Sequence, residues 1–255
     1  MFRSLGLAVP LLALLGGCGT KSAPPGELLL YCGAGLKPPV AEIIEAFEAK
    51  TGARVAADYA GGDHLLAKLR ASGRGDLFLP GDDLYLDQAA AHGFVAARRT
   101  LCYFVPTILV RKGNPKGIRA PADVCAPGIK LGLGDPSACA IGKQSRLLFE
   151  KNGVPWETAR AGCVFQSLTV NELGMQIQAG ALDAVIVWDA VAQYYERHGD
   201  EVPIPIERNV VSEVALAVLS SSRQRDLAEA FLAFAASEAG RALFVKHRYR
   251  VERPR

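Results

Sequence analysis

The stretch Leu131-Gly-Leu-Gly-Asp135-Pro-Ser-Ala-Cys139-Ala-Ile-Gly142 carries the local pattern that decides the fold. An apolar run from Ile129 to Leu133 predicts a buried strand, Gly134-Asp135-Pro136 ends it, and a helical pattern begins near Ala140. A strand, a glycine-containing loop and a helix in this order point free backbone N–H groups at an anion. Because ordinary turns of α/β domains look similar, the weight of this stretch depends on whether the chain repeats it.

The same succession of strand, loop and helix occurs three times earlier in the chain. Strands are expected over 28–32, 55–59 and 76–80, each followed by a loop with glycine and by a helix, over 40–50, 64–72 and 84–91. Asp63 is expected to cap the second of these helices and Asp82-Asp83 the third. Further strands are expected over 164–170 and 184–187. Repeated units of this kind predict parallel sheets with helices on both faces.

Two long extended segments, 101–111 and 210–219, predict crossings between two lobes. The expected fold is therefore an α/β clamp in which each lobe is a mostly parallel sheet flanked by helices and the two crossing strands act as the hinge. We expect the first lobe to comprise 28–105 with 210–255, and the second 106–209. Ligands of such folds bind at the carboxyl ends of the strands, here between the lobes.

The N-terminus predicts export. Arg3 precedes an apolar run from Leu5 to Leu15 that is too short to span a membrane, and Leu15-Gly-Gly-Cys18 resembles the lipobox of bacterial lipoproteins. The resemblance implies a signal peptide over 1–18 that is cleaved before Cys18, with lipid attached to Cys18. Residues 19–27 are small, polar and rich in proline, as in a tether. We expect the mature protein to be periplasmic or otherwise extracytoplasmic, and lipid-anchored to a membrane.

The charge and the cysteine content limit the classes of partner that the protein can bind. The 255 residues include 29 basic and 26 acidic ones without a basic stripe, which argues against a nucleic-acid partner. Apart from Cys18 there are five cysteines: Cys32, Cys102, Cys125, Cys139 and Cys163. These are consistent with small core residues, with disulfides (Cys125 with Cys163, for instance), or with ligands of a soft metal.

Four motifs in order resemble the periplasmic molybdate-binding proteins of ABC importers. They are Tyr31-Cys-Gly-Ala-Gly-Leu36, Asp76-Leu-Phe-Leu-Pro-Gly-Asp82, Gly134-Asp-Pro136 and Ile186-Val-Trp-Asp-Ala190, and the similarity runs from about Leu28 to Tyr249. The resemblance implies the two-lobed periplasmic-binding-protein fold. It also implies a monomeric receptor without a cofactor, which captures molybdate or tungstate and delivers it to a membrane permease.

In that family, hydroxyls and backbone N–H groups hold the oxyanion without charged partners. The resemblance places the corresponding ligand-binding positions here on five short stretches. These are Gly33-Ala34-Gly35, Gly62-Asp63, Cys139-Ala140-Ile141, Val170-Asn171 and Trp188, with the family's two serines falling on Gly35 and on Gly62 or Asp63, and its tyrosine on Trp188.

The missing serines leave alternatives open. An inward carboxylate at Asp63 would repel a dianion, at a cost of about 4 kcal/mol at 4 Å and an effective dielectric constant near 20. Some family members expand the coordination of the metal with carboxylates, a role open here to Asp63, Glu172 or Asp189.

A second reading keeps the receptor role but gives it a thiophilic ligand, because Cys32, Cys102 and Cys139 are all expected to approach the cleft. A third, a hydrolytic enzyme on the same fold, lacks a visible pair of catalytic carboxylates or a nucleophile beside a base. We therefore expect a binding protein.

Overall fold

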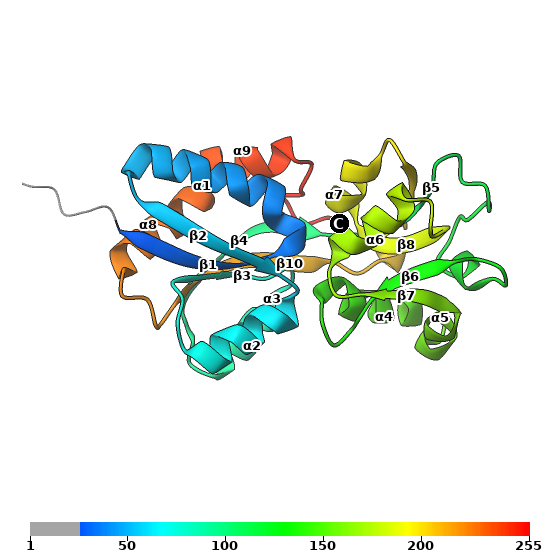
Figure 1. Ribbon diagram of the computed structural model, residues 1–255, viewed down its shortest axis with the longest axis horizontal. Coiled ribbons are helices and arrows are strands. Elements are labelled where there is room, and N and C mark those ends of the chain that lie inside the picture. The colour runs from blue at the N-terminus through cyan, green and yellow to red at the C-terminus, as the bar shows by residue number, and fades with distance from the viewer. Residues whose placement is uncertain (1–25) are drawn as a thin grey trace, which may run out of the picture.

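The computed structural model describes residues 26–255, in which two five-stranded sheets form two lobes side by side (Figure 1). The first lobe has the strand order β2-β1-β3-β10-β4, and the second has β7-β6-β8-β5-β9. The strands of the first lobe, in sheet order, are Arg54–Ala60, Glu27–Gly33, Leu77–Leu79, Ser212–Leu219 and Val95–Phe104. Those of the second are Cys163–Ser167, Leu131–Gly134, Ala184–Trp188, Pro106–Arg111 and Gly199–Val202.

Both sheets are mixed in the same way. In each, the first three strands are parallel, the fourth runs against them, and the fifth is antiparallel to the fourth. The carboxyl ends of the parallel strands of the two lobes meet at the junction between the lobes. The expected signal peptide, Cys18 and most of the expected tether lie outside the described residues.

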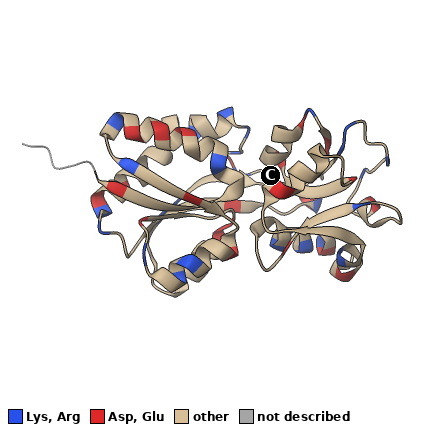
Figure 2. Ribbon diagram, viewed as in Figure 1, with Lys and Arg blue, Asp and Glu red and all other residues tan. Residues whose placement is uncertain are grey.

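Helices cover both faces of each sheet (Figure 1). In the first lobe α1, α8 and α9 lie on one face and α2 and α3 on the other; in the second, α6 and α7 lie opposite α4 and α5. Their bounds in chain order are Lys37–Thr51 (α1), Gly62–Ser72 (α2), Asp83–Ala91 (α3), Ala140–Lys151 (α4), Trp156–Gly162 (α5), Val170–Gln178 (α6), Asp189–Ala192 (α7), Arg225–Ala235 (α8) and Glu238–Lys246 (α9). Charged residues of both signs are spread over these helices, and neither sign gathers on one lobe (Figure 2).

Among residues 26–255, three segments connect the lobes. Two are the expected crossings, from β4 through Val105 into β5 and from β9 through Asn209 into β10. The buried Asn209 side chain ties them together by donating to the Pro106 carbonyl at 2.8 Å. The third is the C-terminal segment, where Tyr103 N donates to Arg250 O at 2.7 Å in the first lobe and Arg250 Nε pairs with Asp189 Oδ2 at 2.6 Å in the second. The chain ends at the junction between the lobes (Figure 1).

Several local expectations were wrong at element boundaries. The first helix begins at Lys37 rather than at Val40, because Pro38 and Pro39 fall in its first turn, where a missing N–H leaves no bond unmade. The edge strand β9 ends at Val202, directly before Pro203, since proline cannot donate to a sheet. The helix α5 was not expected at all.

Of the two capping predictions, one is confirmed and the other is wrong. The Asp82 carboxylate accepts from Leu84 N at 2.9 Å and caps α3, as expected. The N-cap of α2 is Gly61, without a side-chain bond, so the predicted cap at Asp63 was wrong. Within residues 26–255 no helix is both long enough and apolar enough to cross a membrane.

Candidate functional site

A small cavity of about 30 Å³ lies between the lobes, where the carboxyl ends of the strands meet. One ordered water needs about 10–15 Å³ of such volume. The cavity therefore has room for a compact ion rather than for a sugar or a peptide. None of the lining side chains among the described residues is charged. The wall consists of Gly33, Ala34, Gly35, Ala60, Gly61, Gly62, Gly81, Phe104, Cys139, Ala140, Ile141, Thr169, Val170 and Trp188.

Most residues of this wall lie at the N-terminal ends of helices. Gly61 is the N-cap of α2, Cys139 that of α4 and Thr169 that of α6, and none of the three has a side-chain cap bond. The first N–H groups of a helix have no partner within it, and the helix dipole makes that end positive. The wall can therefore stabilise an anion without a cationic side chain.

Three lining side chains can also donate hydrogen bonds: the Thr169 hydroxyl, the Trp188 indole N–H and the Cys139 thiol. The Trp188 ring stacks on Phe104 with centroids 4.8 Å apart and planes at 5°, which joins the second lobe to the first. Burial raises the pKa of the Cys139 thiol to about 11, so it is protonated at neutral pH. It is thus a weak donor and not a thiolate ligand.

Two glycines let the lobes approach closely around the cavity. A Cβ on Gly61 would lie 2.5 Å from Ala138 O and 2.7 Å from Leu168 O, both in the second lobe. A Cβ on Gly35 would lie 2.9 Å from Val170 Cγ1. Only glycine fits at such separations, so the chain is built for a closed arrangement of the two lobes.

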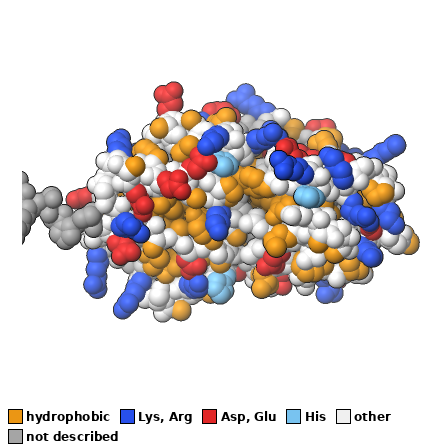
Figure 3. All heavy atoms as spheres, turned by 45° about the horizontal axis from the view of Figure 1, so that its top comes forward, with side chains coloured by type: hydrophobic (Ala, Val, Ile, Leu, Met, Phe, Trp, Pro, Cys, Tyr) orange, Lys and Arg blue, Asp and Glu red, His pale blue; other side chains and the backbone are white. Residues whose placement is uncertain are grey.

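Polar contacts join the lobes around the cavity. Asn171 Nδ2 donates to Ala34 O at 3.1 Å, so this side chain holds the first loop instead of lining the cavity. Gln144 Nε2 donates at 2.6 Å to the carboxylate of buried Asp82, which also accepts from Ser212 Oγ at the start of β10. On the face shown in Figure 3, hydrophobic side chains gather along the middle of the molecule, where the lobes meet.

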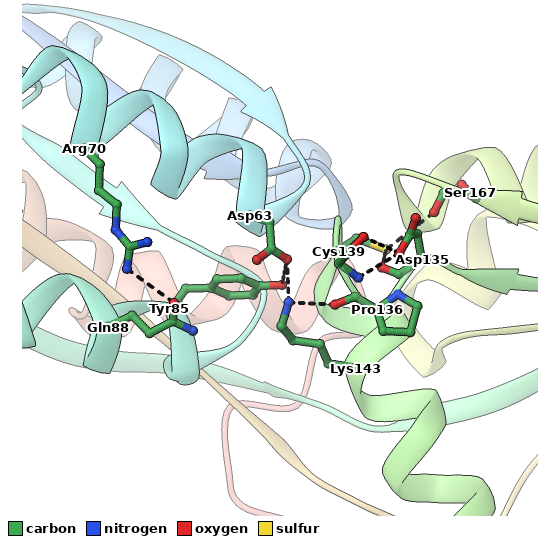
Figure 4. A network of polar contacts seen from close by, with 10 residues as sticks. Asp63, Arg70, Tyr85, Gln88, Asp135, Pro136, Cys139, Lys143 and Ser167 are labelled. Carbon is green, nitrogen blue, oxygen red and sulfur yellow. Dashed lines mark hydrogen bonds and ion pairs between the residues drawn. The ribbon is translucent and has the colours of Figure 1, made fainter. Parts of the chain in front are cut away.

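Asp63 is not part of the cavity wall, and its side chain forms an ion pair with Lys143 of the other lobe (Figure 4). Its Oδ2 atom accepts from Lys143 Nζ in α4 at 2.5 Å and from the Tyr85 hydroxyl in α3 at 2.8 Å. Lys143 Nζ also donates to Pro136 O at 2.7 Å and lies 5.0 Å from the centre of the Tyr85 ring. Because Lys143 neutralises Asp63, the expected repulsion of an anion does not arise.

The other two candidate carboxylates hold backbone rather than facing the cavity. Glu172 accepts from Ser167 Oγ at 2.6 Å and from Leu168 N at 3.1 Å, at the start of α6. Asp189 is buried, accepts from Val105 N at 3.3 Å and pairs with Arg250. Neither side chain lines the cavity, although Glu172 lines a neighbouring hollow together with Asp63, Gly61 and Thr169.

The cysteines do not come together in one site at the cavity. Cys32 and Cys102 are fully buried in the core of the first lobe, and burial raises the pKa of both thiols. Of the three expected at the cleft, only Cys139 lines the cavity. Cys125 and Cys163 are free thiols, so the suggested disulfide is not formed. Within residues 26–255 no cluster of three or more His, Cys, Asp or Glu residues is placed to hold a metal ion.

The cavity therefore brings together much of the predicted ligand-binding set. The predicted residues that line it are Gly33, Ala34, Gly35, Gly62, Cys139, Ala140, Ile141, Val170 and Trp188. Asp63 and Asn171 lie beside it as interlobe contacts. Sequence reasoning missed Ala60, Gly61, Gly81, Phe104 and Thr169. Thr169 and Gly61 could have been found as the N-cap residues of helices that follow strands.

Comparisons with known proteins agree with this architecture. Residues 28–250 match the family model described as bacterial extracellular solute-binding protein. A binding protein of Haemophilus influenzae is 30% identical over 221 residues, which are 87% of this chain and 89% of that protein. Its name specifies no ligand. The molybdate-binding protein ModA of Mycobacterium bovis is 28% identical over 244 residues, 91% of each chain.

Among solved structures, the periplasmic molybdate-binding protein of Azotobacter vinelandii superposes with a TM-score of 0.75. It is 15% identical, and the match covers 89% of this chain and all of the other. At this identity the likeness concerns the fold, which is that of the two-lobed periplasmic binding proteins.

Proposed function

The chain belongs to the family of bacterial extracellular solute-binding proteins, and we propose that it is the receptor of an ABC importer for a small oxyanion, with molybdate or tungstate as its ligand. The family accounts for the receptor role. The choice of ligand is the further step, and it depends on the chemistry of the cavity.

One observation carries this choice: a cavity of about 30 Å³ that is walled by helix N-termini and holds no charged side chain within the described part of the chain. A fully ionised oxyanion presents acceptors on every side, and N–H groups at the starts of α2, α4 and α6 can meet them. The Trp188 indole and the Thr169 hydroxyl supply further donors where the related family has hydroxyl side chains. The mycobacterial molybdate-binding relatives support the same ligand.

Binding is measured by titration calorimetry and thermal unfolding of the purified protein with molybdate, tungstate, sulfate, phosphate, arsenite and Cu(I). Ligand at a thousand times its dissociation constant should add about 4 kcal/mol to the free energy of unfolding. For a chain of this size each kcal/mol raises Tm by roughly 2–4 °C. We expect the largest shift with molybdate or tungstate, whether or not reductant is present. A shift with the thiophilic ligands alone would refute the proposal.

We further propose that the mature protein is a monomer held on the outer side of a membrane by lipid on Cys18, next to its permease. The lipobox supports this assignment. A Cys18→Ala variant should appear in the soluble extracytoplasmic fraction, whereas the natural chain should sediment with membranes. Recovery of both in the same fraction would refute the anchor.

We propose that closure is a rotation of the lobe formed by 28–105 and 210–255 against the lobe formed by 106–209. The crossings at Val105 and Asn209 support this division. The ligand would then enter an open cleft and be enclosed as the lobes meet.

A further inference from the structure

We propose that Asp63 and Lys143 form an ionic latch that holds the two lobes closed, so that these two residues outside the cavity wall determine how long the ligand stays bound. The statement about the ligand rests on the proposed receptor function. The latch itself is argued from the geometry alone.

The latch spans the lobes next to the cavity, because Asp63 directly follows the lining residues Gly61 and Gly62. Asp63 belongs to the first turn of α2 in the first lobe, and Lys143 to the first turns of α4 in the second. Their Nζ and Oδ2 atoms are 2.5 Å apart, and the two side chains are 23% and 30% exposed for Lys143 and Asp63. The pair is therefore screened by solvent less than an ordinary surface pair.

Each partner is held in position by its own lobe. The Tyr85 hydroxyl donates to Asp63 Oδ2, and Tyr85 itself is fully buried in the first lobe. Lys143 Nζ donates to Pro136 O of the second lobe. When the lobes separate, both anchoring bonds can remain while the ion pair breaks. Little side-chain entropy is then lost on closing, which favours the pair.

The latch also lies next to the groups that enclose the cavity. Asp63 is two residues from Gly61, and Asp63 N donates to Ala138 O at 3.4 Å. Lys143 follows Cys139, Ala140 and Ile141 in the same two turns of α4. Breaking the ion pair therefore removes one of the contacts that hold the starts of α2 and α4 together. Dissociation of the ligand should be faster, while its contacts in the closed cavity remain unchanged.

The test is a double-mutant cycle with Lys143→Met, Asp63→Asn and the combined variant. Because the pair lies between a surface and a buried ion pair, we expect each single substitution to raise koff about tenfold. The combined variant should be little worse than either, because both changes remove the same contact. Stopped-flow displacement of molybdate by excess competitor measures koff.

Lys68→Met is the matched control. Lys68 lies on the same helix as Asp63 and pairs with Asp58 Oδ2 at 2.7 Å, but both partners belong to the first lobe. Its removal should leave koff unchanged. Thermal unfolding identifies any variant that fails to fold. If Lys143→Met fails to fold, Asp63→Asn still tests the latch, because it keeps the size of the side chain.

A second measurement needs no ligand. In a Trp156→Phe background, Trp188 is the remaining tryptophan, and it is 2% exposed between the closed lobes. Acrylamide should quench its fluorescence more in Lys143→Met and Asp63→Asn than in the parent or in Lys68→Met. Equal quenching and equal koff in all variants would overturn the latch. If the parent binds no oxyanion yet quenching differs as expected, the proposed ligand is wrong and the latch stands.

Discussion

The substitution Gly61→Ala tests whether the closed lobes form the binding site. The new methyl group would lie 2.5 Å from Ala138 O and 2.7 Å from Leu168 O, both backbone atoms of the opposite lobe. To reach an ordinary separation of 3.4 Å the lobes must part by about 0.9 Å at this point. The backbone of Gly61 has φ −67° and ψ 151°, which alanine adopts without strain, so the effect is purely steric.

Overpacking of this kind costs about 1–3 kcal/mol. Since only the closed form contains the clash, affinity for the oxyanion should fall roughly 5- to 150-fold, while Tm without ligand stays within about a degree or two of the parent. Titration calorimetry and thermal unfolding measure the two quantities. Gly162→Ala is the control, because its added methyl group meets nothing within 4 Å. Unchanged affinity in Gly61→Ala, or an equal loss in Gly162→Ala, would refute the reasoning.

Three further predictions concern the side chains of the cavity wall. Trp188→Phe keeps the stack on Phe104 but removes the indole N–H, so molybdate affinity should fall about tenfold; calorimetry with unchanged affinity would show that the N–H does not meet the ligand. Thr169→Val should weaken binding about three- to tenfold, with Tm unchanged because the hydroxyl makes no cap bond, and a large loss of Tm would contradict this. With its thiol pKa raised to about 11, Cys139 should resist iodoacetamide at pH 8 and react faster only as the pH approaches 11; mass spectrometry of the modified peptide checks this, and rapid modification at pH 8 would be inconsistent with a buried thiol.

The repeated strand, loop and helix pattern predicted the fold well because it is a local signal. The apolar runs that became β1, β6 and β8 are buried on both faces of their sheets, as continuous apolar strands are. The unexpected α5 is only seven residues long, and β9 depends on pairing with β5 more than on its own sequence. Such elements are specified by tertiary contacts, which a linear pattern does not contain.

The site was only partly predictable for the same reason. The loops could be placed at the cleft, because the carboxyl ends of parallel strands share one edge of a sheet. Asp63 looked like a helix cap within its own segment, and its partner Lys143 is 80 residues away. The same holds for Asp189, whose partner Arg250 lies in a C-terminal segment without any motif. Cys32 was placed at the cleft because its strand ends there, yet its side chain points into the core.

The position of β10 has a consequence for how the chain reaches its native state. This strand, from the last quarter of the sequence, inserts between β3 and β4, and its Ser212 bonds Asp82 across 130 residues. The second sheet is formed by one continuous part of the chain, from β5 to β9, so it can assemble early during export. The first sheet stays divided until β10 arrives, because pairing over so long a loop is slow. We expect the first lobe to complete folding last, with β3 and β4 exposed to proteases and chaperones until then.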